Sequence, residues 1–234
     1  LNDKMLTCAI EARTPPDSLY RTVPATLSYA NNLVEIGKYC DRVEIMAYDQ
    51  RRADIKLNDA RTGAPYIPVA DIDWVRKVVT HMGASIPKDK LLLGVATYGH
   101  EYELTVAPNW YKSYARIRAL NPDTALERAD DENVTPSRNS AGEMGFSYWS
   151  LPPNKAQRSA IIPKNTSDGN VVAAKALSYA NATGQTLTVN VVSWSDAEAI
   201  RKKIELAKEL GIAGIAIFKI DGQEDPDLWD MFDK

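Results

Sequence analysis

Four short segments of the chain consist almost entirely of apolar residues, which is typical of strands covered on both faces. These segments are Met5–Ile10, Val43–Tyr48, Leu91–Thr97 and Gly214–Ile220. Apolar residues recur at helical spacing in other segments, which are Tyr29–Tyr39, Ile72–Met82 and Ala197–Leu210. A last short helix is expected over Pro226–Phe232. Strands that alternate with helices in this way predict a parallel sheet with right-handed crossovers.

The connection between the third and fourth predicted strands, residues 98–213, is far longer than a single crossover needs. We therefore expect an α+β insertion over residues 100–190 within a main unit formed by residues 1–99 and 191–234. The insertion is predicted to contain a strand at EYELTV, an aromatic helix over Trp110–Leu120, a strand over Phe146–Leu151 and a helix over Val171–Ala180. The segment TLTVNVVSW then returns the chain to the main unit.

Charge and cysteine content exclude several classes of protein. The 234 residues carry 28 Lys and Arg against 31 Asp and Glu, a net charge of −3, so we expect neither nucleic acid nor a membrane surface as partner. No apolar run approaches the roughly 20 residues of a membrane span. Cys8 and Cys40 are too few for a disulfide scaffold and form no CxxC motif, so we expect two free, buried thiols and no metal or other cofactor.

Polar and aromatic side chains gather where the predicted strands end. If the strands belong to a (β/α) barrel, the side chains just past their carboxyl ends form the active site. The residues found there are Glu11 and Arg13, then Tyr48, Asp49 and Gln50, then Tyr98 and His100, and finally Lys219 and Asp221. Four polar strand ends together favour a functional site over a solvated rim.

Three of these strands carry motifs that occur in order along the chain. Met46-Ala47-Tyr48-Asp49 ends DRVEIMAYD, Tyr98-Gly99 follows the strand in KLLLGVATYGHEYE, and the last strand lies in LAKELGIAGIAIFKIDGQEDPDLW. The series resembles glycoside hydrolase family 18, the chitinase family, over its sixth, seventh and eighth barrel strands. The resemblance implies an α/β fold that is the second half, strands 5–8, of a TIM (β/α)8 barrel. It also implies an α+β insertion domain between strands 7 and 8, where the long connection lies.

The resemblance implies a reaction as well. Members of the family cleave β-1,4 links to N-acetylglucosamine with retention, and the substrate's own acetamido oxygen attacks the anomeric carbon. By resemblance, Tyr48 holds that acetamido oxygen in line and Asp49 holds the distorted sugar. The further residues expected to bind the sugar are Glu11, Met46, Tyr98, His100, Glu103 and Phe218. Judged without the resemblance, Tyr48 is equally well a half-buried core tyrosine with a satisfied hydroxyl.

The sequence departs from the family pattern at three points. It contains no DxxDxDxE run, whose final Glu is the family's proton donor. Phe218 stands where the family commonly has a tryptophan, and His100 where an Arg often follows Tyr-Gly. A complete barrel takes about 250 residues, and roughly 140 of these 234 lie outside the insertion. We therefore expect strands 1–4, with the proton donor, to lie upstream, and the isolated chain to be inactive.

Half of a barrel leaves two strand edges unpaired. Such edges invite pairing, so the expected partners are the missing N-terminal half of the barrel or a second copy of the chain bound through those edges. The substrate is expected to be an N-acetylglucosamine polysaccharide, either chitin or peptidoglycan, and the resemblance indicates a secreted or cell-wall-associated protein. The interpretation requires parallel strands that bring Tyr48 and Phe218 to the same rim.

Two other functions remain open from the sequence. The first is a non-catalytic, lectin-like member of the same fold, which Phe218 and His100 favour slightly. The second is an unrelated phosphate-binding barrel, which requires a glycine-rich loop near the last strands. The segment GQEDPD after the last strand does not resemble such a loop.

Overall fold

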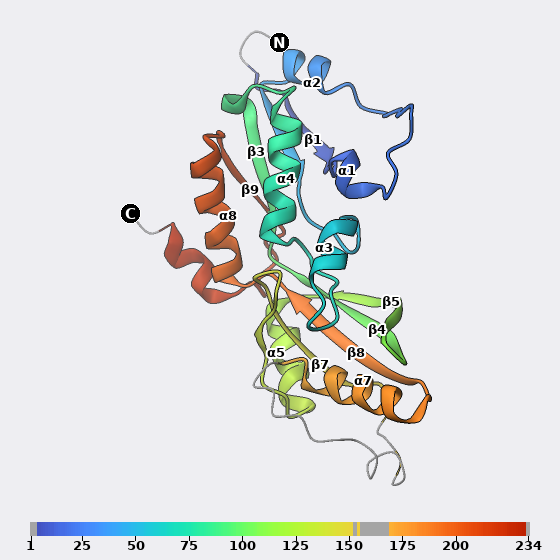
Figure 1. The fold of residues 1–234 in the computed structure, drawn as a ribbon. Coiled ribbons are helices and arrows are strands. Elements are labelled where there is room, and N and C mark those ends of the chain that lie inside the picture. The colour runs from blue at the N-terminus through green and yellow to red at the C-terminus, as the bar shows by residue number, and fades with distance from the viewer. Residues whose placement is uncertain (1–3, 152–153, 155–168, 233–234) are drawn as a thin grey trace.

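The computed structural model describes residues 4–151, 154 and 169–232, and it contains two β-sheets. The first, which we call the parallel sheet, has the strand order β1-β2-β3-β9 (Figure 1). Its strands are β1 (Thr7–Glu11), β2 (Arg42–Met46), β3 (Leu91–Ala96) and β9 (Gly214–Phe218). All three neighbouring pairs are parallel, so the predicted parallel arrangement is confirmed.

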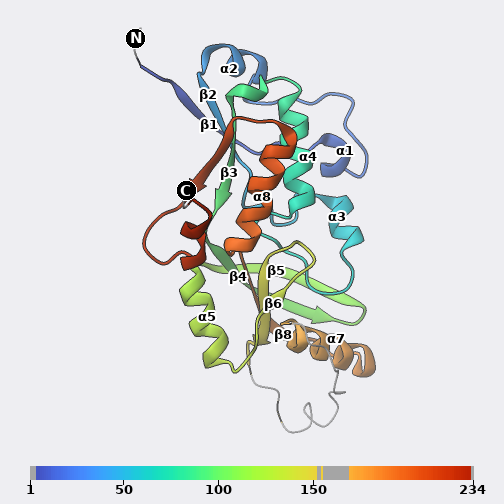
Figure 2. The same ribbon diagram turned by 90° about the vertical axis from the view of Figure 1, so that its left-hand side faces the viewer.

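One face of the parallel sheet is covered by three helices, α2 (Leu33–Tyr39), α4 (Ile72–Gly83) and α8 (Ala197–Leu210) (Figures 1 and 2). The core lies between sheet and helices and is completed by fully buried side chains such as Val43, Ile45, Val75 and Val78. Each of these contributes roughly 1.5–3 kcal/mol of hydrophobic stabilisation.

The helix termini carry the residue types that these positions favour. Asn32, Asp71 and Asp196 are N-cap residues whose side chains accept hydrogen bonds from the first turns of α2, α4 and α8. Gly211 ends α8 with a φ of 67°, a left-handed conformation that glycine adopts without steric cost. Asp196 and Gly211 therefore mark the two ends of α8.

The opposite face of the parallel sheet is open. In β1 the side chains alternate, so that Cys8 and Ile10 pack toward the helices, whereas Thr7, Ala9 and Glu11 are exposed. Both outer strands, β1 and β9, have half-buried or exposed side chains along most of their length. This open face is where the strand-end residues Glu11, Met46, Tyr48 and Phe218 lie.

The second sheet, which we call the antiparallel sheet, has the order β5-β4-β8-β7-β6 and lies beyond the carboxyl end of β3 (Figure 1). Its strands are β4 (Gly99–Ala107), β5 (Trp110–Leu120), β6 (Ser137–Arg138), β7 (Met144–Trp149) and β8 (Leu187–Trp194). Helix α7 (Val171–Thr183) packs against Tyr102 and Leu104 of β4, whereas α5 (Pro122–Asp131) packs with Phe146 and Tyr148 of β7. Residues 152–153 and 155–168 of the predicted insertion lie outside the described residues.

The aromatic segment Trp110–Leu120 is a strand, so the predicted helix was wrong. It forms a hairpin with β4, in which Ala107 pairs with Trp110 and leaves Pro108 and Asn109 as a two-residue loop. Asn109 has a φ of 77°, which Asn tolerates better than most residues and which a tight hairpin turn requires. Pairing with β4 and packing against α7 outweigh a helical preference that is weak for aromatic residues.

The two cysteines form a disulfide. The expectation of two free, buried thiols, which rested on the number of cysteines, was therefore wrong. Cys8 lies on β1 and Cys40 directly follows α2, with Cα atoms 6.1 Å apart. The bond closes a loop of 32 residues, which corresponds to roughly 3–4 kcal/mol of stabilisation through the unfolded state. Disulfide formation depends on the distance between β1 and the end of α2, and this distance cannot be predicted from the number of cysteines.

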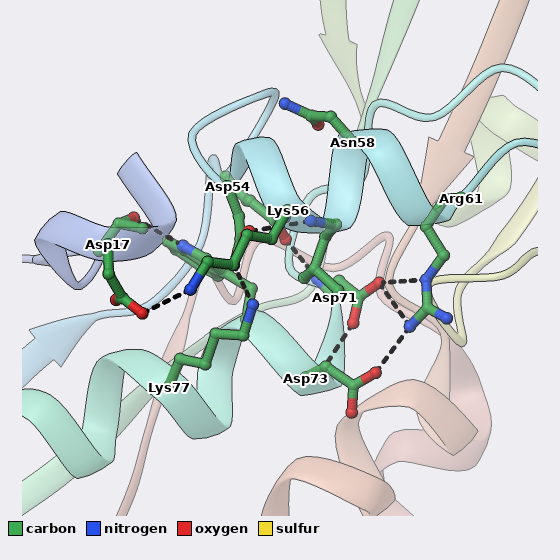
Figure 3. A network of polar contacts seen from close by, with 12 residues as sticks. Asp17, Asp54, Lys56, Asn58, Arg61, Asp71, Asp73 and Lys77 are labelled. Carbon is green, nitrogen blue, oxygen red and sulfur yellow. Dashed lines mark hydrogen bonds and ion pairs between the residues drawn. The ribbon is translucent and has the colours of Figure 1, made fainter. Parts of the chain in front are cut away.

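Two short helices that the sequence did not indicate are joined to α4 by a polar network (Figure 3). They are α1 (Pro16–Leu19) and α3 (Ile55–Ala60). Lys56 of α3 pairs with Asp17 of α1, and the fully buried Asp54 caps α3 and pairs with Lys77 of α4 at 2.6 Å. The network fixes the chain segment that follows the strand end of β2. Two 3-10 helices, η1 (Lys88–Lys90) and η2 (Pro226–Met231), complete the elements within the described residues.

Candidate functional site

The candidate site begins on the open face of the parallel sheet. Glu11 and Met46 are register partners at the ends of β1 and β2 and therefore share one face. Together with Tyr48, Asp49 and Trp74 they line an open cavity of about 400 Å³. Side chains two residues apart on a strand lie on the same face, so Met46 and Tyr48 both face this cavity.

Small residues on β3 allow two aromatic rings to meet across it. The rings of Tyr48, just past β2, and Phe218, at the end of β9, are stacked with centroids 5.5 Å apart and an interplanar angle of 12°. Between their strands, β3 offers only Gly94 and Ala96. A Cβ atom at Gly94 would lie 2.6 Å from the Ile45 carbonyl oxygen and 3.2 Å from Cε1 of Tyr48. The absence of a side chain at Gly94 therefore allows the Tyr48 ring to occupy its observed position.

Asp49 is the polar centre of the site. Its backbone turns away from β2 in a left-handed conformation, with a φ of 56° that Asp tolerates better than most residues. The Tyr98 hydroxyl donates to Oδ1 of Asp49 at 2.9 Å, and Nε2 of the buried His100 lies 2.6 Å from the same oxygen. We place the His100 proton on Nε2 because the carboxylate can only accept. Among the described residues, Oδ2 of Asp49 has no hydrogen-bond partner, and the side chain is 41% exposed.

The surroundings keep Asp49 ionised and the two tyrosines protonated. Partial burial raises the pKa of the Asp49 carboxyl, but the hydrogen bonds from His100 and Tyr98 outweigh it, so that the pKa is lowered. Burial, followed by the negative charge of Asp49, raises the pKa of Tyr98. Burial also raises the pKa of Tyr48, together with the charges of Glu44 and Asp49. Near neutral pH the site therefore offers an acceptor carboxylate and a phenolic donor side by side.

The Tyr48 hydroxyl is available to a ligand. The side chain is half-buried, and the part of the chain that the structure describes provides no hydrogen-bond partner for this hydroxyl. A core tyrosine with a satisfied hydroxyl, the alternative considered from the sequence, is therefore wrong. A second open cavity of about 270 Å³ shares Glu11 with the first and extends toward Tyr29, whose ring lies 3.7 Å from the Arg13 guanidinium carbon.

A loop held by buried hydrogen bonds supports Asp49 from behind. The backbone N–H of Gln50 donates to the Val69 carbonyl at 2.8 Å, and the Gln50 side chain accepts from Asp71 N–H at 2.8 Å and donates to the Tyr66 hydroxyl at 3.1 Å. Gln50 was noted as a strand-end residue, but its structural partners were not predicted. Gln50 is buried, with 2% of its surface exposed, and these hydrogen bonds show that it positions the loop.

Glu143 is a buried residue that sequence reasoning missed. Its carboxylate accepts hydrogen bonds from Val69 N–H at 3.0 Å, Ala70 N–H at 2.6 Å and the Ser193 hydroxyl at 2.9 Å. Glu143 thereby ties the antiparallel sheet to the loop that holds Gln50. It follows a polar, turn-rich stretch that gave no signal of burial.

Of the predicted site residues, Glu103 lies apart from the others. It is exposed, and alternation along β4 places it on the face opposite to His100 and Tyr102. Its carboxylate accepts a hydrogen bond from the Ser150 hydroxyl at 2.8 Å. Lys219 and Asp221, noted at the last strand end, form an ion pair with each other.

Over residues 4–151, 154 and 169–232, no group of three or more His, Cys, Asp and Glu side chains is placed to hold a metal ion. In the same residues, no helix combines the length and apolar character that spanning a membrane requires. The groups that converge are aromatic rings, a phenol and a carboxylate. Such a set suits a ring-shaped ligand rich in hydroxyl and amide groups, because the rings supply stacking faces and the polar groups supply directional hydrogen bonds.

Comparison with known proteins places this geometry in a family. The family model for glycosyl hydrolases family 18 matches residues 2–223. A protein of Bacillus subtilis (strain 168), the uncharacterized glycosylase YvbX, is 22% identical over 203 residues, covering 86% of this chain and 44% of that protein.

Solved structures agree on the fold. The spore cortex-lytic enzyme SleL of Bacillus megaterium QM B1551 superposes with a TM-score of 0.61 at 22% identity, covering 98% of this chain and 41% of that one. A chitinase from Chromobacterium violaceum ATCC 12472 superposes with a TM-score of 0.60 at 18% identity, covering 97% and 53%. The chain thus spans about half the length of these relatives, or less. Since the family model covers residues 2–223 of 234, this chain belongs to glycosyl hydrolase family 18.

Proposed function

We propose that this chain is the C-terminal half, strands 5–8, of a glycoside hydrolase barrel that acts on β-1,4-linked N-acetylglucosamine polymers. In this proposal β1, β2, β3 and β9 are the four strands, and residues 100–190 are the insertion domain between the last two. The observation that carries the proposal is the free Tyr48 phenol beside the ionised Asp49, at the carboxyl ends of parallel strands and against the Phe218 ring.

The proposed reaction is substrate-assisted hydrolysis with retention. The Tyr48 hydroxyl donates to the carbonyl oxygen of the substrate's acetamido group and holds that oxygen in line with the anomeric carbon. The raised pKa of Tyr48 keeps this proton in place near neutral pH. Phe218 supplies a stacking face for the sugar, with less area than the indole that the family commonly has there.

Asp49 is proposed to orient the acetamido group and to stabilise positive charge as the ring intermediate forms. Its Oδ1 is held by His100 and Tyr98, which leaves Oδ2 for the substrate. A carboxylate fixed in this way is aimed before the substrate arrives, so no reorganisation is needed during the reaction. We propose that the same cleft includes four further binding or supporting residues, which are Glu11, Met46, Tyr98 and His100. Glu103 can contact the sugar only if the substrate reaches the opposite face of β4.

The family's proton donor has no counterpart here, since no DxxDxDxE run occurs in the sequence. We therefore expect the purified 234-residue chain to bind N-acetylglucosamine oligomers without cleaving them. Calorimetry with chitotetraose tests the binding, and a fluorogenic chitobioside tests the cleavage. Binding that is lost in Tyr48→Phe and Asp49→Asn supports the assignment. Turnover of the chitobioside by the isolated chain, or chitotetraose binding that neither substitution weakens, would contradict it.

A non-catalytic, lectin-like role is the second candidate, which Phe218 and His100 favour because both depart from the family pattern. The two functions differ in one residue, the one at the end of the fourth barrel strand. Glutamate at that position in the full-length gene supports the hydrolase, and any other residue supports the lectin.

The exposed strands β1 and β9 are the proposed contact surfaces for the remaining half of the barrel. Their side chains are largely half-buried or exposed, and Ile220 beyond β9 is 60% exposed. A second copy of the chain bound through the same edges is the alternative occupant, and sedimentation analysis of the isolated chain distinguishes the two. The Cys8–Cys40 disulfide favours an oxidising compartment, in agreement with a secreted or cell-wall-associated protein.

A further inference from the structure

Asp49 is attached to the antiparallel sheet in two independent ways. Its carboxylate oxygen Oδ1 lies 2.6 Å from Nε2 of His100, which is on β4. Its backbone continues into Gln50, whose N–H donates to the Val69 carbonyl at 2.8 Å. The Val69 N–H in turn donates to Oε2 of Glu143, the residue that directly precedes β7, at 3.0 Å. The side chain and the backbone of Asp49 are therefore attached to two different strands of one sheet.

Ser193 of β8 closes these two attachments into a ring. It is the register partner of His100, and its hydroxyl donates to Oε2 of Glu143 at 2.9 Å, the same oxygen that accepts from Val69. The contacts thereby lead back to the residue from which they started. We call this closed set the Asp49 ring, and its members are Asp49, Gln50, Val69, Glu143, Ser193 and His100.

The direction of the Ser193 hydroxyl follows from its other neighbour. Nδ2 of Asn139 donates to the Ser193 hydroxyl oxygen at 3.1 Å, which leaves the Ser193 hydrogen for the Glu143 carboxylate, an acceptor only. Oδ1 of Asn139 also accepts from the Glu143 N–H at 3.1 Å and so fixes the backbone before β7. The strands β4 and β8 approach closely at this point, since a Cβ atom at Gly99 would collide with the Ser193 carbonyl oxygen. Ser193 is therefore held firmly in the ring.

Burial separates Asp49 from the rest of the ring. The other five members are buried, whereas the Asp49 side chain is partly exposed. A buried carboxylate is costly unless it is hydrogen-bonded, and that of Glu143 receives three donors, which are the N–H groups of Val69 and Ala70 and the Ser193 hydroxyl. The ring therefore has a fully bonded interior, and only the carboxylate of Asp49 reaches the surface.

We infer that Glu143 and Ser193 are positioning residues that set the direction of the Asp49 carboxylate. Among the described residues, neither of them is hydrogen-bonded to the Asp49 side chain, so they act through the loop and the strands of the ring. The inference rests on the proposed function for the use that is made of Asp49. It adds that the antiparallel sheet aims this carboxylate before a substrate arrives, which avoids reorganisation during the reaction.

The physical argument concerns what happens when one bond of the ring is lost. Without the bond to Glu143, Val69 is free to shift, and Gln50 and the backbone of Asp49 shift with it. His100 stays with β4, because it belongs to the paired strands. The distance between His100 and Oδ1 of Asp49 therefore increases, and the carboxylate loses its fixed direction.

The test follows the Asp49 carboxyl carbon by carbon-13 NMR while the pH is varied, and it needs no ligand. The ring variants are Ser193→Ala and Glu143→Gln, and Asp49→Asn assigns the resonance. The control is Ser147→Ala, because Ser147 is a buried serine of β7 in the same sheet. Its hydroxyl oxygen accepts from the Ala173 N–H at 3.0 Å and is not part of the ring.

Both ring variants are expected to raise the pKa of Asp49. Partial burial raises this pKa in the wild type, but the hydrogen bonds from His100 and Tyr98 outweigh it, and longer bonds would stabilise the carboxylate less. The sign is informative for Glu143→Gln, since the loss of a negative charge would by itself lower the pKa of Asp49. Ser147→Ala should leave this pKa unchanged.

Binding of chitotetraose, measured by calorimetry, is the second readout. Its Kd should rise about three- to ten-fold in Ser193→Ala, which corresponds to the net contribution of about one hydrogen bond, and should not change in Ser147→Ala.

Three outcomes overturn the positioning role. They are an Asp49 pKa that is unchanged or lowered in either folded ring variant, an equal rise in Ser147→Ala, and a chitotetraose Kd that Ser193→Ala leaves unchanged. If Glu143→Gln does not fold, Ser193→Ala decides alone, because it removes a single neutral hydroxyl. Failure of the wild-type chain to bind chitotetraose contradicts the proposed function instead, and the NMR result for Asp49 still stands.

Discussion

The ring of Tyr48 stacks on the ring of Phe218 across a strand that separates them, with centroids 5.5 Å apart. The contact exists because the strand between them, β3, carries Gly94 and Ala96 at this point. The two rings therefore form a continuous aromatic surface next to Asp49. This surface depends on Gly94, which has no side chain of its own to contact a ligand.

Replacing Gly94 by alanine is expected to destabilise the protein by about 1–3 kcal/mol, because the new Cβ meets a backbone carbonyl that cannot move away freely. The same substitution should displace Tyr48 and weaken chitotetraose binding. Urea unfolding and calorimetry measure the two effects. Gly63→Ala is the matched control, since nothing lies within 4 Å of its added Cβ, and a similar loss in both variants would show that the Tyr48 contact is not the cause.

The carboxylate of Asp49 makes stability depend on pH in a defined direction. Because its pKa is lowered on folding, the ionised form stabilises the native state above the unfolded pKa of about 3.9, and this contribution is lost as the pH falls through the folded value. The melting temperature of the wild type should therefore exceed that of Asp49→Asn most at neutral pH, and the difference should shrink in acid.

The same measurement on Tyr98→Phe should show a smaller effect of the same sign, because only one of the two hydrogen bonds to Oδ1 is removed. Thermal unfolding followed by circular dichroism between pH 7 and pH 3 measures these differences. A gap between wild type and Asp49→Asn that stays constant over this range would contradict the role assigned to the charge.

The Cys8–Cys40 disulfide is expected to contribute roughly 3–4 kcal/mol, since it restricts a 32-residue loop in the unfolded chain. Reduction with dithiothreitol should lower the guanidinium midpoint of the wild type by a corresponding amount. The double variant Cys8→Ser with Cys40→Ser should already be at the lower value and should not respond to the reductant. A wild type that is insensitive to reductant would show that the thiols are not paired.

Glu143→Gln is expected to cost about 2–4 kcal/mol, because the amide replaces one acceptor oxygen by a donor that faces a buried N–H. Hydrogen exchange should become faster at Val69 and Ala70, whose N–H groups lose their partner. Glu127→Gln, on the exposed side of α5, is the control and should change neither quantity. Unchanged protection at Val69 and Ala70 would contradict the link between the antiparallel sheet and the loop behind Asp49.

The prediction from sequence succeeded where local pattern and physical constraint coincide. The segment Val43–Tyr48 is largely apolar because helices cover one face of the strand. The residues just past the strand are polar, which identified Tyr48 and Asp49 as strand-end residues. The prediction failed at Trp110–Leu120, where pairing with β4 decides the conformation, and at Cys8 and Cys40, where only distance in space decides the pairing. It also missed Glu143, because a carboxylate in a polar stretch shows no sign of burial.

The order of strands and helices, the residues at the strand ends and the family motifs were all contained in the sequence, because burial and helical spacing repeat along the chain itself. The stacking of Tyr48 on Phe218 and the shared hydrogen bonds at Asp49 were decided by the tertiary structure alone. These contacts join residues from different strands and loops, and their geometry depends on small side chains and strand registers that no local pattern records.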